Sequence, residues 1–239
     1  MSPRYGPRIM VRRFRLMTAN LLNGKADPGN LGEVLDRVRP DVIVTQEMGP
    51  NAAEVIASRY PHHDLHPDLI HQGRGIASRF DAEFSPLVLP WRSGSWARVE
   101  IGLQPIIVAD VHMPNPIIFP WWVSVPGRTD QLDALFAWAD RTIGGEAVVV
   151  AGDMNATPRW PLYRRLAERW EDLAVTAALS SGTSPAPTWG LRPSWPRILR
   201  IDHVLGSGMR AVGTAVERLQ GSDHSALIVD MELHQIDGS

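Results

Sequence analysis

The sequence of 239 residues contains no cysteine. Its absence excludes disulfide bonds, thiolate metal sites and a cysteine nucleophile, and leaves the redox compartment open. Net charge is also small, because 24 Lys and Arg stand against 26 Asp and Glu. We therefore expect no general electrostatic attraction to nucleic acid or to anionic membranes.

Long apolar runs are missing as well. None approaches the ~18–20 residues of a membrane span. The arginine-rich start of the chain lacks the apolar segment of a signal peptide. We therefore expect a cytoplasmic protein, with residues 1–12 as a basic leader.

Apolar residues are plentiful, at 44% of the sequence, which is enough for a substantial core. The length is typical of one large domain, and we expect a single domain over residues 13–239. A Ser-, Pro- and Trp-rich stretch at residues 180–197 is expected to be an irregular loop within it.

Short apolar runs bounded by Gly, Pro, Asp or Asn predict strands. They cover residues 15–22, 41–47, 75–80, 96–101, 105–113, 147–155, 200–208 and 225–233. Helical spacing of apolar residues predicts helices at 30–40 and 127–143, with Asn30 and Thr129 as N-caps, and a third helix at 160–173. Because strands outnumber helices, two packed sheets with outer helices fit better than one alternating sheet.

Polar side chains collect near the ends of these apolar runs. Asn20 lies within "RFRLMTANLLNG", where an amide needs a hydrogen-bonding partner to offset its burial. Further examples are Gln46 with Glu47, Asp110 with His112, Asp153 with Asn155, Asp202 with His203, and Asp223 with His224. Strand ends that meet at one edge could build a single acidic pocket.

The stretch "VVVAGDMNATP" is the most specific of these. Its valines predict a buried strand, and the i, i+2 spacing puts Asp153 and Asn155 on one face. Taken alone, the stretch is equally well explained as a turn rich in Asp and Asn. The stretch "GSDHSALIV" alone is a common turn that contains a histidine.

Together and in this order, the motifs resemble the endonuclease/exonuclease/phosphatase superfamily, which includes deoxyribonuclease I, exonuclease III and neutral sphingomyelinases. The resemblance runs from Leu16 to about Leu233. It rests on Asn20, Glu47, Ser78 and Arg79 in "GIASRF", His112, Arg128 and Gln131 in "GRTDQL", Asp153, Asn155, Asp202, Asp223 and His224. It implies a four-layer α/β sandwich of two packed, mainly antiparallel or mixed β-sheets with outer helices.

The resemblance also implies a divalent-metal-dependent hydrolase of phosphate esters. Mg²⁺ is the expected cofactor, with Mn²⁺ or Ca²⁺ as alternatives, held by Asn20 and Glu47, with Asp223 available for a second ion. His224 would act as acid/base or charge stabiliser, and Asp202 would hold its other ring nitrogen. Asp153 would orient or deprotonate water, Asn155 would donate to the phosphorus centre, and His112 would be a second phosphate donor.

The substrate is less defined. We expect a phosphodiesterase acting on a small or lipid-like phosphodiester. The first alternative is a nuclease, which the net charge does not favour, and the second is a catalytically inactive binding module of the same fold. No obligate protein partner is expected.

The segment "PNPIIFPWWVSVPG" (residues 114–127) is apolar, aromatic and broken by prolines. We expect no regular strand or helix in it. It could fold back into the core or form a dimer contact. It could also expose Trp121 and Trp122 as a substrate rim, together with Arg79, in peripheral contact with lipid. The histidines at 62, 63, 66 and 71 are expected to lie in an ordinary exposed loop.

Overall fold

The computed structural model describes residues 9–102, 104–116 and 121–236. Within these residues the strands form two six-stranded sheets. The first has the order β11-β12-β1-β2-β4-β3, and the second the order β5-β6-β7-β8-β10-β9.

The strands of the first sheet are β1 (Ile9–Asn20), β2 (Val42–Gln46), β3 (His62–His66), β4 (Arg74–Ser78), β11 (Arg210–Arg218) and β12 (Ser225–Ile236). Those of the second are β5 (Ala82–Leu87), β6 (Gly94–Ile101), β7 (Gln104–Asp110), β8 (Ala147–Asp153), β9 (Glu171–Asp172) and β10 (Asp202–Ser207).

Each sheet has one parallel strand pair near its centre. β1 runs parallel to β2, and β7 runs parallel to β8, while the other pairs are antiparallel. Parallel neighbours end at the same edge of their sheet, and this edge is where α/β proteins commonly bind ligands. The predicted mixed sheets are confirmed.

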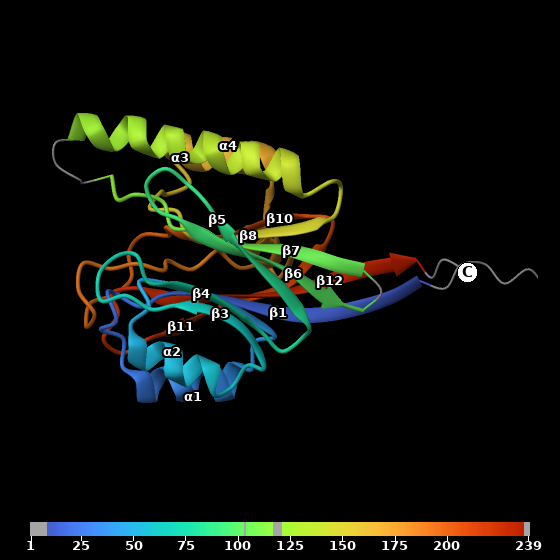
Figure 1. Cartoon of the computed structure of the whole chain (residues 1–239), viewed down its shortest axis with the longest axis horizontal. Coiled ribbons are helices and arrows are strands. Elements are labelled where there is room, and N and C mark those ends of the chain that lie inside the picture. The colour runs from blue at the N-terminus through green and yellow to red at the C-terminus, as the bar shows by residue number, and fades with distance from the viewer. Residues whose placement is uncertain (1–8, 103, 117–120, 237–239) are drawn as a thin grey trace, which may run out of the picture.

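Helices cover both outer faces of the two sheets (Figure 1). They are α1 (Pro28–Val38), α2 (Pro50–Ala57), α3 (Trp121–Thr142) and α4 (Pro161–Arg169). The remaining helix, α5 (Leu173–Ser180), packs buried residues into the core between the sheets. In Figure 1, α1 and α2 lie below the first sheet, and α3 and α4 lie above the second. The four-layer sandwich is therefore confirmed.

Strand side chains alternate between two cores. On β1, Leu16 packs between the sheets, whereas Met17 packs against α1 and α2. On β8, Val149 packs between the sheets, whereas Val148 and Val150 face α3 and α4. Because both faces are buried, these strands are almost continuously apolar in sequence.

Several helix ends differ from the sequence predictions. The side chain of Asp27, not Asn30, caps α1 by accepting from the Asn30 N–H. The helix expected from residue 127 begins at Trp121 and contains Thr129, so Thr129 is not its N-cap. The expected third helix divides into α4, the short β9 and α5, because Trp170 takes an extended conformation.

Other corrections concern the chain start and two expected loops. Residues 9–12, expected in the leader, belong to β1. Three of the four histidines expected in a loop lie on edge strand β3. Within the Ser-, Pro- and Trp-rich stretch, Trp189 forms bridges to Leu199 and His224, so this loop is partly ordered by backbone pairing.

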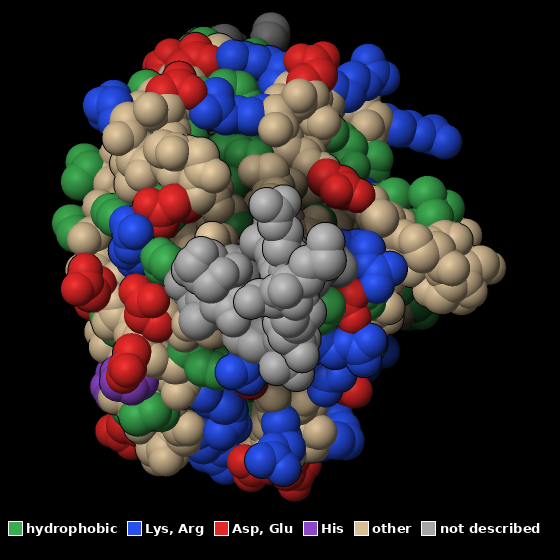
Figure 2. Space-filling model, turned by 90° about the vertical axis from the view of Figure 1, so that its right-hand side faces the viewer, with side chains coloured by type: hydrophobic (Ala, Val, Ile, Leu, Met, Phe, Trp, Pro, Cys, Tyr) green, Lys and Arg blue, Asp and Glu red, His purple; other side chains and the backbone are tan. Residues whose placement is uncertain are grey.

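The end of the sandwich near Ile9 and Ile236, which are paired between β1 and β12, faces the viewer in Figure 2. Acidic and basic side chains are interspersed there around the grey residues. Both strands are twelve residues long, so Asn20 and Ser225 lie at the opposite end. No helix of the described residues is long and apolar enough to cross a membrane.

Asp110 is an ionisable group that is buried between the sheets. Asp110 is 1% exposed, and its Oδ1 accepts from Gln46 Nε2 at 2.6 Å while its Oδ2 has no partner. Burial raises the pKa of Asp110 to about 8. The folded chain therefore keeps a proton on Asp110 that the unfolded chain releases above pH ~4.

This linkage predicts that stability falls as pH rises from about 4 towards 8 and then levels off, because only the folded state holds the proton over that range. Asp110→Asn keeps the shape and removes the charge. We expect the free energy of unfolding of the wild type to fall by roughly 4 kcal/mol more than that of the variant between pH 5 and 8. Urea denaturation of metal-free protein measures it.

The control is Asp130→Asn, an exposed carboxylate on α3. It should follow the wild-type pH profile. Parallel profiles for the wild type and Asp110→Asn would contradict the assignment.

Candidate active site

The layer between the sheets changes from apolar to polar at one end. On β1 the inward residues after Leu16 are Thr18 and Asn20, and on β8 Asp153 follows Val149 and Ala151. The other central strands do the same, with Gln46 on β2, Asp110 on β7 and Asp202 on β10. Hydrogen bonds between Asn20 and Asp153 and between Gln46 and Asp110 join the two sheets across this layer.

A cavity of about 760 Å³ opens at this polar end. Its lining residues are Leu22, Asn23, Glu47, His71, Arg92, Asn115, Pro116, Asp153, Asn155, Thr157, Trp160, Trp189, Leu199, Ile201, Asp223 and His224. They come from both sheets and from the loops that follow the central strands.

Backbone strain is concentrated around this cavity. Among the described residues, five that are not glycine have positive φ, and four of them, Leu22, Asn23, Glu47 and Asn155, line the cavity. Such conformations cost on the order of 1 kcal/mol or more each. At Glu47, with φ 52°, the turn also breaks strand alternation. Gln46 already faces inward, so continued strand geometry would direct Glu47 to the outer face.

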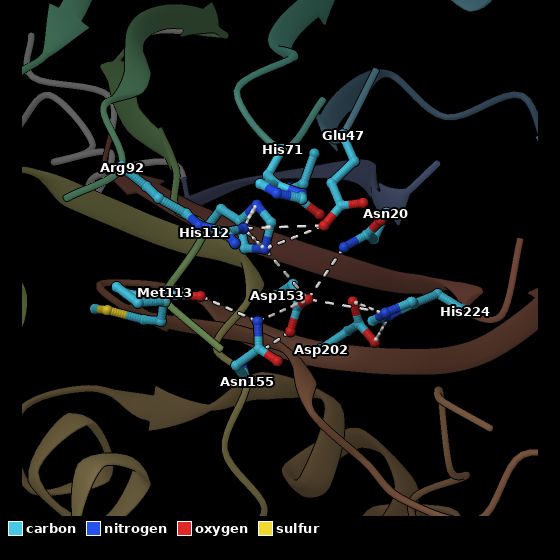
Figure 3. Close-up of polar contacts among 12 residues, drawn as sticks. Asn20, Glu47, His71, Arg92, His112, Met113, Asp153, Asn155, Asp202 and His224 are labelled. Carbon is cyan, nitrogen blue, oxygen red and sulfur yellow. Dashed lines mark hydrogen bonds and ion pairs between the residues drawn. The ribbon is translucent and has the colours of Figure 1, made fainter. Parts of the chain in front are cut away.

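Asp153 lies at the centre of the polar cluster (Figure 3). Its Oδ2 accepts from Asn20 Nδ2 at 3.1 Å and from Asn155 Nδ2 at 3.2 Å, and its Oδ1 accepts from the Asn155 backbone N–H at 2.8 Å. Burial, reinforced by the Asp202 charge, raises the pKa of Asp153 to about 7. A carboxylate this deeply buried is favoured in its charged form by a nearby cation.

His224 is held by a second carboxylate. Its Nδ1 lies 2.9 Å from Asp202 Oδ2, so its Nε2 faces the cavity, 3.8 Å from Asp153 Oδ2. Burial alone would lower the pKa of His224, but the charges of Asp202 and Asp153 outweigh it and raise the pKa to about 9. In the metal-free protein His224 is therefore an imidazolium that can donate from Nε2.

His112 and Arg92 form the opposite side of the cluster. Arg92 Nη1 lies 2.7 Å from His112 Nδ1, and His112 Nε2 lies 3.5 Å from Asp153 Oδ2 and 3.7 Å from Glu47 Oε1. Burial, together with the Arg92 and His224 charges, holds the pKa of His112 well below its usual value. His112 is therefore neutral, and Arg92 carries the positive charge on this side.

Two buried side chains of α3 position the loops of the site. Gln131 accepts from the Arg92 backbone N–H at 2.9 Å and donates to the His112 carbonyl at 2.9 Å. Arg128 donates to the carbonyls of Pro114 and Asn155. These contacts explain why Arg128 and Gln131 occur in the motif set without lining the cavity.

The donor atoms suit a hard divalent cation, which prefers carboxylate and amide oxygens. Among the described residues, the donor atoms that converge within 4.8 Å belong to Asp153, Asp202 and His224. In addition, Asp223 Oδ1 is buried without a hydrogen-bond partner, while Asp223 Oδ2 accepts from Trp189 Nε1 at 3.1 Å. Asp223 Oδ1 lies 3.9 Å from His224 Nε2, beyond hydrogen-bond distance, which leaves it suited to a cation.

The structure brings most of the expected site residues together: Asn20, Glu47, His112, Asp153, Asn155, Asp202, Asp223 and His224. The convergent set differs from the expected metal ligands Asn20, Glu47 and Asp223, whose role stays a prediction. Asn20 directs its amide nitrogen at Asp153, and its oxygen accepts from the Leu22 N–H.

Arg79 does not lie at this cavity, so its expected place on the rim is wrong. It follows β4, whose Ser78 pairs with Val42 at the start of β2, whereas Glu47 follows the other end of β2. There Arg79 donates to the Pro40 carbonyl and lies over the Tyr60 ring. The side chains of Trp121 and Trp122 lie outside the described part of the structure.

The cavity-lining residues that the sequence did not predict include Leu22, His71, Arg92, Trp160, Trp189 and Leu199. Arg92 follows β5 in a loop without a motif, and no local pattern distinguishes its side chain from an exposed arginine. The tryptophan-rich composition of residues 180–197 was the available signal for Trp189.

Solved structures similar to this chain share its fold. They include humanized D. rerio TDP2 with 14 mutations, with a TM-score of 0.73 and 17% identity over 92% of this chain and 98% of that one. An endonuclease/exonuclease/phosphatase from Beutenbergia cavernae matches with a TM-score of 0.67 and 22% identity over 93% and 72% of the two chains. A conserved protein of unknown function from Enterococcus faecalis V583 matches with a TM-score of 0.69 and 14% identity over 94% of this chain and 100% of that one.

No curated protein matches the sequence. The family model described as the Endonuclease/Exonuclease/phosphatase family matches residues 17–224. Members of this family are in general divalent-metal-dependent phosphoric ester hydrolases. The expected resemblance is confirmed, and the chain belongs to the endonuclease/exonuclease/phosphatase family.

Proposed function

We propose that this protein is a divalent-metal-dependent phosphodiesterase that acts on a small or lipid-like phosphodiester. The observation that carries the proposal is the convergence of Asp153, Asp202 and His224 within 4.8 Å, with Asp153 and His224 lining a cavity. Glu47 and Asp223 line the same cavity, and Asp223 Oδ1 has no hydrogen-bond partner among the described residues.

The cation would be held by carboxylates of this cluster, with Glu47 and Asp153 as the first candidates, Asn20 beside them, and Asp223 for a second ion. Mg²⁺ fits the oxygen donors, and Mn²⁺ or Ca²⁺ are alternatives. When bound, such a cation polarises a phosphoryl oxygen and offsets the negative charge of the transition state.

The remaining side chains have separate roles in this proposal. Asp153 orients or deprotonates the attacking water, and its placement by Asn20 and Asn155 supports that role. His224 donates from Nε2 to a phosphoryl oxygen or the leaving group, while Asp202 fixes Nδ1. His112, neutral beside Arg92, would be a further phosphate donor.

Asn155 is the expected donor to the phosphorus centre. Its amide already donates to the Met113 carbonyl and to Asp153, so positioning Asp153 is supported more directly than a contact with substrate.

Arg92 would bind the phosphate itself. Of the described residues that line the cavity, it is the one Lys or Arg, and its guanidinium lies 3.9 Å from Glu47. A guanidinium in a site with little water stabilises phosphoryl oxygens by charge and by directional hydrogen bonds.

A nuclease is the second candidate. D. rerio TDP2 in complex with a single-strand DNA product has a similar fold, with a TM-score of 0.71 and 16% identity over 92% of this chain and 98% of that one. The net charge of -2 gives no general attraction to DNA, so this function is secondary. An inactive binding module is the third candidate, which the dense set of acid, base and amide groups disfavours.

The test is a substrate panel on metal-stripped protein with Mg²⁺, Mn²⁺ and Ca²⁺ added back. We expect metal-dependent hydrolysis of bis(p-nitrophenyl) phosphate, with slower cleavage of plasmid DNA. Glu47→Gln should weaken Mg²⁺ binding in calorimetry and reduce turnover by ~10²-fold, because a charged ligand becomes neutral at constant shape. Glu54→Gln, exposed on α2, is the matched control.

Faster cleavage of DNA than of small diesters, lost in Glu47→Gln, would favour the nuclease. No turnover of any phosphate ester with any of the metals would favour the binding module. Unchanged Mg²⁺ affinity in Glu47→Gln would remove Glu47 from the metal site.

His224→Ala should reduce kcat by ~10²-fold or more, the loss expected for a positioned acid or charge stabiliser. Asp202→Asn should give a smaller loss and lower the pKa of His224, because the Asp202 carboxylate is the main charge that raises it. NMR titration of the metal-free protein measures that pKa. His66→Ala, on edge strand β3, is the control. An unchanged His224 pKa in Asp202→Asn would show that Asp202 does not act through His224.

Arg92→Met should lower kcat/KM by ~10²-fold, the scale of one electrostatic contact in the transition state. Mg²⁺ should bind at least as tightly, because a positive charge near Glu47 is gone. Arg92→Lys should recover part of the rate. Weaker Mg²⁺ binding in Arg92→Met would mean that Arg92 holds the loop rather than the phosphate.

A further inference from the structure

Six residues that line the active-site cavity are apolar, and together they are called the apolar wall. Its residues are Leu22, Pro116, Trp160, Trp189, Leu199 and Ile201. Phosphate chemistry requires none of them, because the acids, amides, histidines and arginine of the cluster lie elsewhere in the same cavity. The apolar wall therefore needs a separate explanation.

Strand alternation directs two of these side chains into the cavity. Leu199 and Ile201 are two positions apart and line it together. The residue between them, Arg200, points the other way, where it pairs with the buried Asp172 at 2.7 Å. The carbonyl of Ile201 accepts from the Met154 N–H at 2.9 Å, which fixes this segment beside Asp153.

The apolar wall is also held rigidly. Trp189 and Leu199 pair through backbone hydrogen bonds in both directions. The indole N–H of Trp189 donates to the Asp223 carboxylate. Arg197 anchors the hairpin by donating to the carbonyls of Ser222 and His224, at 2.8 and 3.0 Å, and to Ser225 Oγ at 3.1 Å. The wall is thus fixed to the strand end that carries His224.

Two of these side chains remain substantially exposed, whereas Ile201 is buried. Trp160 and Leu199 are each 38% exposed. Because the only polar atom of the Trp189 side chain is already bonded to Asp223, its ring can offer a ligand only apolar surface. A preorganised apolar surface beside a reactive centre is the usual form of a specificity site, since little conformational freedom is lost when it binds.

We propose that the apolar wall binds one large apolar or aromatic substituent of the phosphodiester while the phosphate lies on the polar cluster. The inference rests on the proposed function and names its substrate class: a diester with one apolar arm, from an aryl ester or a lipid. A nucleic-acid strand fits less well, because its backbone needs a basic track and Arg92 is the one Lys or Arg among the described lining residues.

The test compares methyl, phenyl and octyl p-nitrophenyl phosphate, which share one leaving group. The wild type should show kcat/KM at least about tenfold higher for the phenyl and octyl esters than for the methyl ester, since tenfold corresponds to burial of about two methylene groups. Leu199→Ser should reduce that ratio severalfold. Ile198→Ser is the matched control, because Ile198 is 57% exposed on the same hairpin and does not line the cavity.

The esters distinguish the source of the apolar arm. A higher rate with phenyl than with octyl indicates an aryl ester. A rise confined to octyl ester above its critical micelle concentration indicates a lipid aggregate. Three results would overturn the proposal. The first is equal kcat/KM for all three esters, and the second is an equal ratio of kcat/KM between the apolar esters and the methyl ester in Leu199→Ser and wild type. The third is faster cleavage of a thymidine dinucleotide than of the octyl ester.

Binding tests the apolar wall independently of turnover. Calorimetry with octylphosphonate and methylphosphonate, with and without Mg²⁺, should show at least tenfold tighter binding of the octyl compound, and Leu199→Ser should reduce the difference. If no ester is hydrolysed but this difference is present, the proposed function fails and the assignment of the wall stands. Equal dissociation constants for both phosphonates in the wild type would overturn the assignment.

Discussion

The face-to-face packing of two sheets is the constraint on which the site depends. Side chains on the inward faces cannot reach water along most of their length, so they are apolar there and interlock into one core. Where the same faces carry Asn20, Gln46, Asp110, Asp153 and Asp202, the polar groups must satisfy one another across the gap. The result is a set of carboxylates kept close together and poorly hydrated, which is a chemically reactive arrangement.

Charge balance in this layer is asymmetric. Asp153 and Asp202 share the His224 imidazolium, whereas Asp110 accepts from the Gln46 amide and keeps its proton. Glu47 faces Arg92 at 3.9 Å, which is a weak pairing for a charge that is 12% exposed. A bound divalent cation would complete this balance, because the cluster holds more acceptors than donors.

Much of this architecture could be predicted because local patterns of the sequence indicate it. Continuous apolar strands indicate two buried faces, and the ordered motifs around Asn20, Glu47, Asp153 and His224 indicate the family. Arg92 and Leu199 could not be found this way, since only the packing of distant segments brings them to the cavity. Arg79 misled for the opposite reason: it lies in a motif, but the motif marks the far end of β4.

The predicted helix ends were wrong for a related reason. Asn30 and Thr129 are acceptable caps by residue type, but Asp27 precedes a proline at the first helical position and forms the better one. The start of α3 at Trp121 was missed because Pro126 lies inside it. Pro126 is the sixth residue of α3, beyond the first turn in which proline is readily tolerated. It has no N–H for the carbonyl four residues earlier, so its presence argues against a helix there.

At the residues with left-handed backbone around the cavity, thermal stability and the proposed catalytic role place opposite demands on the side chain. Glycine would relieve the steric strain at Leu22, Asn23, Glu47 and Asn155. A selection for thermal stability alone would favour it where no side-chain hydrogen bond of the kind made by Glu47 and Asn155 is lost. Each such change would remove a side chain from the cavity lining. Directed evolution of this scaffold would therefore reach greater stability by giving up activity unless both were selected together. Positions near the opposite ends of β1 and β12, such as the paired Arg13 and Glu232, offer stabilising changes without that conflict.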